Sequence, residues 1–226
     1  MREKAVVLLS GGLDSAVCMA VASDNGYELL PISFNYGQRH LRELDYARLI
    51  ANHYNVASHL VIDTNLCAIG GSALTDERVD LPKGNINQSE IPATYVPGRN
   101  LIFLSYALAY AEVNEASRIF IGVNALDYSG YPDCRPEFIT LFQNLADYAT
   151  KAAVEKKCRI IIETPLLNSM KKDIVLLGDK LKAPLHLTTS CYRGEEAACG
   201  ECDSCLLRLK GFAEASMKDP IKYLED

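Results

Sequence analysis

The sequence lacks an apolar run of the roughly 18 to 20 residues that a membrane-spanning helix needs. Its beginning, MREKAVVLLSGG, lacks the long apolar core of a secretory signal. A basic excess is also missing, because the net charge is −6 and gives no overall positive field for holding nucleic acid. We therefore expect a cytoplasmic protein that binds neither a membrane nor nucleic acid.

A glycine-rich loop at residues 10–15 (SGGLDS) lacks the lysine of a Walker A motif. It follows an apolar run and precedes a helical pattern. Glycines let backbone N–H groups approach an anion, and a helix start offers unpaired N–H groups and the positive end of its dipole. The loop thus predicts a phosphate site in which Asp14 caps the helix or helps to hold Mg²⁺. The alternative is an ordinary strand-to-helix turn with a serine cap.

The 226 residues, 49% hydrophobic and 23% charged, are typical of one large globular domain or of a domain with an appendage. Apolar β-rich runs alternate with helical patterns, which predicts an α/β fold with a Rossmann-like parallel sheet and helices on both faces. We expect strands near 5–9, 29–34, 58–63, 118–123 and 159–163, and helices near 14–24, 40–54, 100–116, 135–155 and 169–180. Ligands of such sheets bind at the carboxyl ends of the strands. The helix at 100–116 is apolar on nearly all sides, so we expect it to be the most deeply packed.

Residues 64–98 interrupt this alternation with glycines, prolines and polar residues of little periodicity. Loops of this length in compact domains are often functional lids or mobile segments. The alternative is a surface insertion without a role in chemistry. The segment ends in a Pro-Gly turn that delivers Arg99 and Asn100 to a helix start.

Four of the eight cysteines lie within fifteen residues, in the pattern Cys191-x7-Cys199-x2-Cys202-x2-Cys205. Four thiolates suit a closed, structural zinc site. An iron–sulfur cluster or a redox-active C-x-x-C pair are the alternatives. We expect Cys18, Cys67 and Cys158 to be ordinary small apolar residues; the role of Cys134 is left open.

Several longer segments occur in order behind the SGGLDS loop: FNYGQRH at 34–40, TYVPGRNLIFLS at 94–105, GVNALDYSGYPDCRPEF at 122–138, SCY at 190–192 and CGECDSCLLR at 199–208. Together they resemble the 7-cyano-7-deazaguanine synthases, the QueC family of PP-loop ATP pyrophosphatases, over residues 5 to 213. The resemblance implies an adenine nucleotide alpha hydrolase-like domain at 1–186 and a four-cysteine zinc segment at 187–226. It also implies ATP, Mg²⁺ and Zn²⁺ as cofactors, a cytoplasmic location and a homodimer.

The activity implied by this resemblance is a ligase of queuosine biosynthesis. It would convert 7-carboxy-7-deazaguanine and ammonia to the nitrile through an adenylated acid and an adenylated amide. No glutaminase module is visible in the sequence, so we expect ammonia to be free or to come from another protein. Two alternatives remain: a PP-loop enzyme that adenylates a base in tRNA, and a nonenzymatic adenine-nucleotide sensor.

The same resemblance suggests roles for individual residues. The catalytic candidates are Asp14, Ser15, Lys171 and Arg99. The ATP-binding candidates are Leu8, Leu9, Ser10, Gly11, Gly12, Leu13, Asp14, Ser15, Ala16, Val17 and Cys18. The substrate-binding candidates are Asn100, Asn124, Asp127, Tyr131, Asp133 and Arg135. Each assignment has an alternative. Lys171 could be a solvated lysine on its helix, and Arg99 could form an ion pair that only stabilises the structure. The candidates at 124–135 could serve only to order their own loop through turn hydrogen bonds. We expect His40, His53 and His59 to be structural.

Overall fold

The computed structural model describes residues 2–38, 42–76, 78–80, 91–124 and 131–224. It contains a five-stranded, entirely parallel sheet with the order β3-β2-β1-β4-β5. The strands are β1 (Lys4–Leu8), β2 (Glu28–Asn35), β3 (Leu60–Asp63), β4 (Arg118–Phe120) and β5 (Ile161–Glu163). The expected Rossmann-like sheet is confirmed. The chain builds outward from β1 first to one side and then to the other, and such a switch point opens a crevice at the carboxyl ends of β1 and β4.

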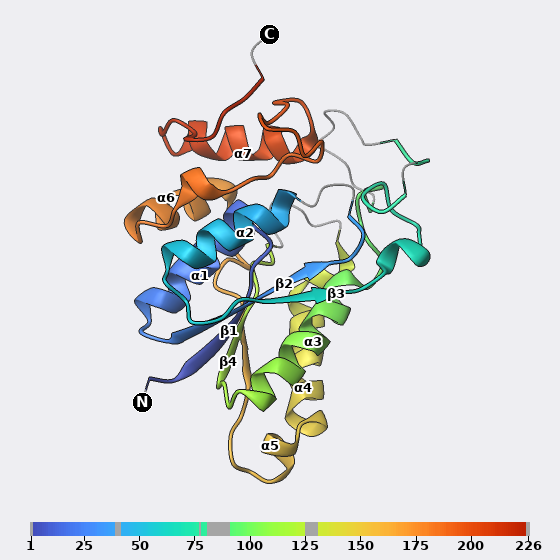
Figure 1. Ribbon diagram of the computed structural model, residues 1–226, viewed down its shortest axis with the longest axis vertical. Helices are drawn as coiled ribbons and strands as arrows, with labels where there is room; N and C mark the ends of the chain where they lie inside the picture. The colour runs from blue at the N-terminus through green and yellow to red at the C-terminus, as the bar shows by residue number, and fades with distance from the viewer. Residues whose placement is uncertain (1, 39–41, 77, 81–90, 125–130, 225–226) are drawn as a thin grey trace.

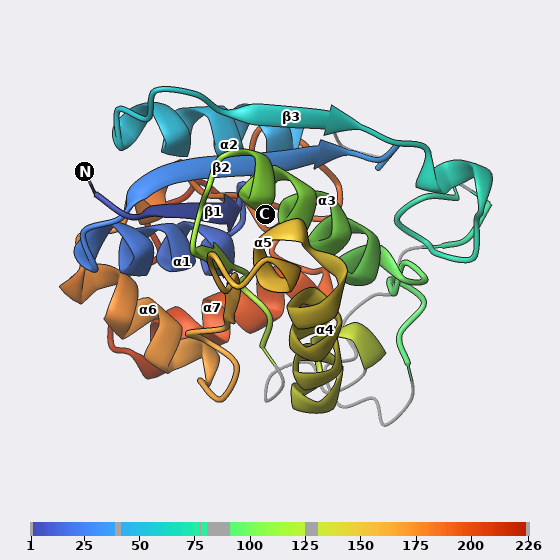
Figure 2. The same cartoon turned by 90° about the horizontal axis from the view of Figure 1, so that it is seen from below.

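Helices cover both faces of the sheet (Figures 1 and 2). They are α1 (Leu13–Asp24), α2 (Arg42–His53), α3 (Arg99–Val113), α4 (Pro136–Ala149), α5 (Lys151–Val154), α6 (Lys171–Lys180) and α7 (Asp203–Glu214), with 3₁₀ turns at Leu66–Ala68, Pro132–Cys134 and Leu185–Leu187. Helices α1 and α2 lie on one face, and α3 and α4 lie on the other. Helices α6 and α7 pack together and form an outer layer against α1.

Alternation along β1 divides the core into two layers. Val6 and Leu8 join the cluster beneath α3 and α4, whereas Ala5 and Val7 join the cluster beneath α1 and α2. Successive side chains of a strand point to opposite faces, so a central strand covered on both faces must be apolar throughout. This requirement explains the unbroken apolar run that precedes the glycine-rich loop.

The prediction that the helix at 100–116 is the most deeply packed was wrong. In α1, eight of twelve residues are buried, but in α3 only six of fifteen are. Helix α1 lies between the sheet and α6, so two sides of it are covered. The outer side of α3 faces solvent, and Val113 near its end is 82% exposed.

The structure differs from the expected helices in two further places. The predicted helix at 135–155 is broken at Thr150, whose backbone is extended and whose hydroxyl accepts the N–H of Ala153 at the start of α5. Helix α7 was not among the predicted helices. Its first turn begins directly after Cys202 and contains Cys205.

The described parts of the 64–98 segment are held to the rest of the fold. The N–H of Ala73 donates to the carbonyl of Ala93, which joins two parts of the segment to each other. The Thr94 hydroxyl lies 2.8 Å from that of Tyr131, and Val96 is buried in the core. Residues 81–90 lie outside the described part, so the lid role stays a prediction. Among the described helices, none combines the length and apolarity that crossing a membrane requires.

Candidate active site and cysteine cluster

A cavity of about 330 Å³ lies at the carboxyl edge of the sheet. Its walls come from the loop between β1 and α1, the ends of β2 and β4, the starts of α2, α3 and α6, and the segment 189–208. The cavity therefore occupies the crevice predicted from the strand order. Segments far apart in the sequence meet there, including the phosphate-binding candidate loop and the region of the cysteines.

Two glycines allow the backbone of this site to pack closely. Gly11 has a φ of +87°, and a Cβ at this position would lie 2.2 Å from the carbonyl oxygen of Glu43. A Cβ on Gly122, just after β4, would lie 3.1–3.2 Å from the backbone of Asp14 and Ser15. Side chains at either position would push apart the elements that form the cavity.

The two serines of the loop form a hydrogen-bonded network around its backbone. The Ser15 hydroxyl donates to the carbonyl of Gly12 at 2.9 Å and accepts the N–H of Ser10 at 3.2 Å. The Ser10 hydroxyl accepts the N–H of Gly12 at 3.2 Å and lies 3.1 Å from the Ser15 hydroxyl. Helix α1 begins after Gly12 without a side-chain cap, which leaves its first N–H groups for a ligand.

Lys171 and Asp14 form an ion pair across the cavity edge. The ammonium lies 2.9 and 3.0 Å from the two carboxylate oxygens, and the side chains are 16% and 26% exposed. Gly211 of α7 makes room for the lysine stem, because a Cβ there would lie 2.5 Å from the Lys171 Cγ. The lysine is therefore packed into the site rather than solvated along its helix.

Arg99 lines the cavity together with Tyr36 and Glu43. Burial raises the pKa of Glu43 to about 7, and the positive charge of Arg99 acts in the opposite direction. Burial also raises the pKa of Tyr36 to about 12. One wall thus carries a fixed cation, a neutral phenol and a carboxyl group that titrates close to neutral pH.

The six substrate-binding candidates occupy different places. Asn100, Asn124 and Tyr131 line the cavity. Asp133 is buried, and its carboxylate accepts the N–H of Asn100 at 2.9 Å in the first turn of α3. Arg135 is exposed before α4. Asp127 lies outside the described residues, and the individual roles in binding stay predictions.

Of the ATP-binding candidates, seven line the cavity: Leu8, Leu9, Ser10, Gly12, Leu13, Asp14 and Ser15. Ala16, Val17 and Cys18 follow within α1 and are fully buried. Burial raises the pKa of the Cys18 thiol well above its ordinary value, as expected for a packing residue. Gly11 is absent from the lining, but its lack of a side chain lets the loop pack against the backbone of Glu43 in α2.

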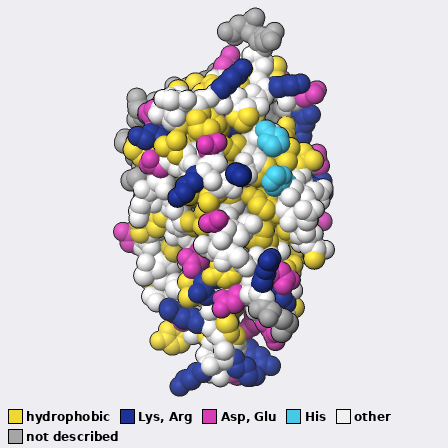
Figure 3. Space-filling view, turned by 90° about the vertical axis from the view of Figure 1, so that its left-hand side faces the viewer, with side chains coloured by type: hydrophobic (Ala, Val, Ile, Leu, Met, Phe, Trp, Pro, Cys, Tyr) yellow, Lys and Arg dark blue, Asp and Glu magenta, His cyan; other side chains and the backbone are white. Residues whose placement is uncertain are grey.

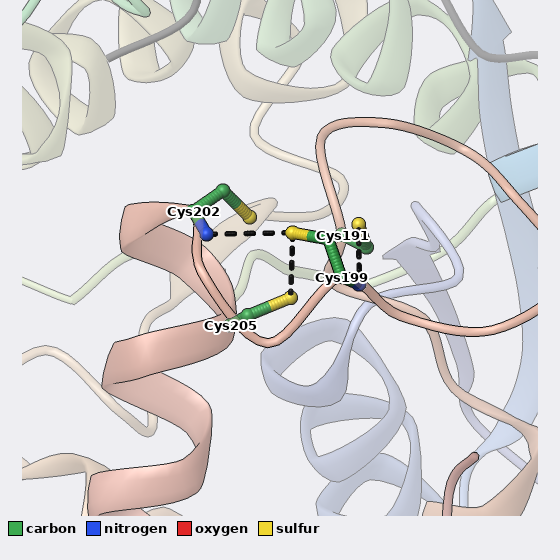
Figure 4. A group of neighbouring side chains, drawn as sticks. All are labelled: Cys191, Cys199, Cys202 and Cys205. Carbon is green, nitrogen blue, oxygen red and sulfur yellow. Dashed lines mark hydrogen bonds between the residues drawn. The ribbon is translucent and has the colours of Figure 1, made fainter. Parts of the chain in front are cut away.

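The four clustered cysteines converge on one point (Figure 4). All four sulfur atoms lie within 4.8 Å of one another, and those of Cys199 and Cys205 are 3.9 Å apart. A tetrahedral zinc site with Zn–S bonds of about 2.3 Å needs sulfurs about 3.8 Å apart, so the donor set fits. Backbone N–H groups of Cys199 and Cys202 also point to cluster sulfurs at 3.4 Å, which would stabilise negative thiolates. This buried cluster is suited to holding a metal ion.

The other predicted structural residues vary in their surroundings. Cys134 is buried and lines the cavity, 3.3 Å from the side-chain nitrogen of Asn100, whereas Cys158 is exposed rather than packed. His59 lies 2.7 Å from the Ser33 hydroxyl, and His53 is exposed at the end of α2. His40 lies outside the described residues.

Several lining residues were not singled out from the sequence. They are Tyr36, Glu43, Thr189, Ser190, Tyr192 and Arg208. Tyr36 directly follows β2, and its place at the carboxyl end of a predicted strand was a usable signal, whereas Glu43 lies in the first turn of α2. Ser190, Tyr192 and Arg208 lie in the SCY and CGECDSCLLR segments that carried the resemblance, so those segments were also a usable signal, whereas Thr189 lies outside them.

A buried ion pair fixes that segment. The Arg208 guanidinium donates to both oxygens of Asp219, at 2.7 and 3.0 Å, and their side chains are only 2% and 5% exposed. Arg208 also donates to the Thr188 hydroxyl at 2.8 Å, and Asp219 accepts the hydroxyl of Tyr223 at 2.7 Å. The pair thus connects the cavity wall to the last described residues, where Ala198 forms a bridge with Tyr223.

Replacing Asp219 with Asn should lower the free energy of unfolding by about 3–5 kcal/mol, because a buried guanidinium would lose its anionic partner. Denaturant unfolding followed by circular dichroism measures the change. The matched control is Glu214→Gln at the end of α7, the helix that contains Arg208. Glu214 forms an exposed pair with Lys210, so this change should alter the free energy of unfolding by less than about 1 kcal/mol. Equal effects of the two variants would contradict the structural role of Asp219.

On the face shown in Figure 3, Lys and Arg side chains are intermingled with Asp and Glu side chains over most of the surface. Mixed charge of this kind does not concentrate positive potential. On this face the described residues therefore offer no extended basic stripe of the type that binds nucleic acid.

Known proteins provide an independent comparison. The family model described as "Queuosine biosynthesis protein QueC" matches residues 4–216. A protein of Desulfitobacterium hafniense (strain Y51) named 7-cyano-7-deazaguanine synthase 2 is 57% identical over 222 residues, which cover 98% of this chain and 94% of that protein. The 7-cyano-7-deazaguanine synthase of Acetivibrio thermocellus is 55% identical over 225 residues, 99% of both chains.

Solved structures show the same fold at low sequence identity. NMN synthetase from Francisella tularensis has a TM-score of 0.51 and 15% identity, covering 96% of this chain and 79% of that one. A predicted subunit of tRNA methyltransferase from Methanocaldococcus jannaschii also has a TM-score of 0.51, with 18% identity over 99% of this chain and 93% of that one. The fold is thus shared with distant proteins, while the family model and the close relatives match almost the whole sequence. The chain belongs to the QueC family of queuosine biosynthesis proteins.

Proposed function

We propose that the chain is an ATP-dependent ligase that converts 7-carboxy-7-deazaguanine and ammonia to 7-cyano-7-deazaguanine. The observation that carries this proposal is one cavity that joins the SGGLDS loop and Lys171 to a wall containing Arg99, Asn124 and Tyr131. Such a cavity can hold a nucleotide phosphate next to a planar, polar second substrate. Relatives above 50% identity that are named 7-cyano-7-deazaguanine synthase support the choice of that substrate.

In the first step, the substrate carboxylate attacks the α-phosphorus of ATP, and pyrophosphate leaves. The free N–H groups at the start of α1 and the Ser10 and Ser15 hydroxyls can donate to phosphate oxygens. Lys171 supplies a positive charge that stabilises the α-phosphoryl transition state, and Asp14 holds its ammonium at the cavity edge. Arg99 can bind the carboxylate or a phosphate through its two-pronged guanidinium.

The remaining steps exchange oxygen for nitrogen on the same carbon. Ammonia attacks the acyl adenylate, AMP leaves, and the product is the amide. A second ATP then adenylates the amide oxygen, and loss of AMP with the remaining N–H protons gives the nitrile. Adenylation is required twice because oxide and hydroxide are poor leaving groups, whereas AMP is a good one.

On the substrate side, Tyr131 can stack on the deazaguanine ring, and the amide of Asn124 can bond its polar edge. The Asp133 carboxylate, which we also proposed for substrate recognition, would have to act in addition to its bond with the N–H of Asn100. Arg135 is exposed, so a substrate role for it would require contact outside the described cavity lining.

Metal ions complete the proposal. Mg²⁺, with Asp14 as a candidate ligand, would neutralise charge on the departing pyrophosphate. Zn²⁺ held by Cys191, Cys199, Cys202 and Cys205 would be structural, because four thiolates leave no open coordination position. The zinc segment then serves the reaction by fixing Ser190, Tyr192 and Arg208 in the cavity wall.

The test is product analysis by mass spectrometry after incubation of the protein with 7-carboxy-7-deazaguanine, ammonium, ATP and Mg²⁺. The proposal predicts the nitrile and about two AMP per nitrile formed, since each turnover contains two adenylations. Intact ATP in the presence of this acid would contradict the proposed substrate. AMP formation also separates this function from a nucleotide sensor, and tight, salt-sensitive tRNA binding would instead support the alternative of a tRNA-modifying ligase.

We further propose that the protein acts as a homodimer in the cytoplasm and without nucleic acid. Apolar side chains at consecutive turns of α4 support an interface, since Leu141, Leu145 and Tyr148 are 68%, 51% and 84% exposed. Replacing Leu145 with Glu should shift the mass measured by light scattering from dimer toward monomer. A variant that stays dimeric to the same dilution would exclude this face as the interface.

A further inference from the structure

The proposed reaction, on which this inference rests, must remove protons from nitrogen. Ammonium enters with four N–H bonds, and the nitrile nitrogen has none. One proton leaves to free the lone pair that attacks the acyl adenylate, and a second leaves as the amide forms with loss of AMP. The last two leave during adenylation of the amide oxygen and elimination of the second AMP. A group in the cavity that accepts protons near neutral pH would serve each of these steps.

The described lining of the cavity contains two carboxyl groups, those of Asp14 and Glu43, and they differ in whether they are available to accept a proton. Asp14 forms the close ion pair with Lys171 already described. Arg99 and Lys171 are cations and cannot accept a proton while charged. Tyr36 is a neutral phenol whose pKa burial raises to about 12. Glu43 is the remaining carboxyl group of the described lining.

The backbone holds Glu43 in a defined place. It belongs to the first turn of α2, and its carbonyl oxygen packs so closely on Gly11 that any side chain at 11 would collide with it. Helix α2 is thus locked against the phosphate-binding candidate loop, and the Glu43 side chain lines the same cavity as that loop. Glu43 is half-buried as a whole residue and lines the cavity, which gives protons a path away from its carboxyl group.

The charges around Glu43 suit a proton acceptor rather than a permanent anion. Burial raises the pKa of Glu43 to about 7, and Arg99 from α3 limits this rise. Tyr36, at the end of β2, faces both groups as a neutral side chain. A carboxylate with a pKa near the working pH is both substantially ionised and basic enough to take a proton.

We propose that Glu43 is the general base of the ammonia-dependent steps, accepting protons from the ammonium nitrogen and then from the amide nitrogen. Each transfer breaks one N–H bond and forms one O–H bond on the Glu43 carboxylate, which then releases the proton to solvent. The electron pair of the broken N–H bond stays on nitrogen and becomes available for bonding to carbon. AMP departs with the C–O bonding electrons in both eliminations.

The decisive comparison is Glu43→Gln against the wild-type protein, with Asp45→Asn as the matched control. Asp45 is an acidic residue in the same turn of the helix and forms an exposed pair with Arg48. Glu43→Gln should lower ammonium-dependent nitrile formation by about 10²–10⁴-fold. It should leave ATP–pyrophosphate exchange with the acid alone within a few-fold of wild type, because the first adenylation moves no proton. Asp45→Asn should match wild type in both assays.

The pH dependence gives a second readout. At fixed total ammonium the wild-type rate should rise with pH and level off above about pH 7, where Glu43 is ionised. The Glu43→Gln rate should keep rising about tenfold per pH unit in this range, because the variant depends on free ammonia. Hydroxylamine is largely unprotonated at neutral pH, so it needs no base before it attacks the acyl adenylate. With hydroxylamine in place of ammonium, the variant should therefore form the hydroxamate at a rate closer to that of the wild-type protein. Glu43→Asp, which retains a carboxylate, should retain the plateau.

Three results would overturn the role of Glu43: a wild-type rate in Glu43→Gln, an equal loss of pyrophosphate exchange and nitrile formation, or the absence of rescue by hydroxylamine. If Glu43→Gln does not fold, the test uses Glu43→Asp instead. A Glu43→Asp rate that keeps rising with pH above about pH 7 would then overturn the role of Glu43. Failure of the underlying function is distinguishable, because the wild-type protein itself would then form no nitrile.

Discussion

Replacing Lys171 with Met should lower the rate of nitrile formation by about 10²–10³-fold, the usual cost of removing one charged or hydrogen-bonding group that stabilises a transition state. The variant should still fold, because the methionine side chain can follow the lysine stem through the space left by Gly211. Lys172→Met is the matched control, since Lys172 is the next residue of α6 and is exposed. Initial rates of AMP release measure both variants.

We expect the effects of replacing Lys171 and Asp14 to be non-additive in a double-mutant cycle. They form one ion pair at the cavity edge, so removing Asp14 after Lys171 should cost less than removing Asp14 from the wild-type protein. Pyrophosphate exchange measures the first adenylation alone and should fall in each variant. Fully additive losses would show that the two side chains act separately, and a Lys171→Met variant with wild-type exchange would remove Lys171 from the adenylation step.

Replacing Cys202 with Ser should reduce bound zinc and the stability of the fold together. Loss of a structural metal site is one of the few single changes that costs more than about 4 kcal/mol, because metal binding and folding are coupled. Zinc content by elemental analysis and thermal unfolding by calorimetry measure the two effects. Cys158→Ser is the matched control, since Cys158 is exposed and outside the cluster.

The same variant should lose activity for a reason that the geometry supplies. The residues between and beside the cysteines include Tyr192, Ser204 and Arg208, and these line the cavity. Disordering this segment would open one wall of the site, so substrate binding should weaken along with stability. A zinc-free Cys202→Ser variant that keeps wild-type stability would contradict the structural role of the metal.

The sheet and the phosphate-binding candidate loop could be predicted because their signals are local. An apolar run followed by glycines and a helical pattern identifies a strand, a tight turn and a helix start without further information. The cysteine spacing likewise identified sulfur atoms that the fold brings within 4.8 Å. In each case neighbouring residues carry the whole pattern.

The parts that were missed depend on packing between distant segments. Arg208 occurred in the sequence analysis only as the last residue of the CGECDSCLLR segment, yet Asp219 and Thr188 bury it in the wall of the site. The depth of α1 was underestimated because α6, which covers its second side, lies more than a hundred residues later in the chain. Periodicity reports one helix face at a time and cannot reveal which later element will cover another face.

The strand order has a consequence for how the protein folds. Strand β1 pairs with β2, which follows it after the single helix α1, but its pairing with β4 brings together residues as far apart in sequence as Ala5 and Arg118. Contacts so distant in sequence form slowly, because a long loop must close before any of them stabilises the chain. An early intermediate containing β1, β2, β3, α1 and α2 would already possess the SGGLDS turn. It would still lack the β4 side of the crevice, so nucleotide binding should appear only in the last kinetic phase of refolding.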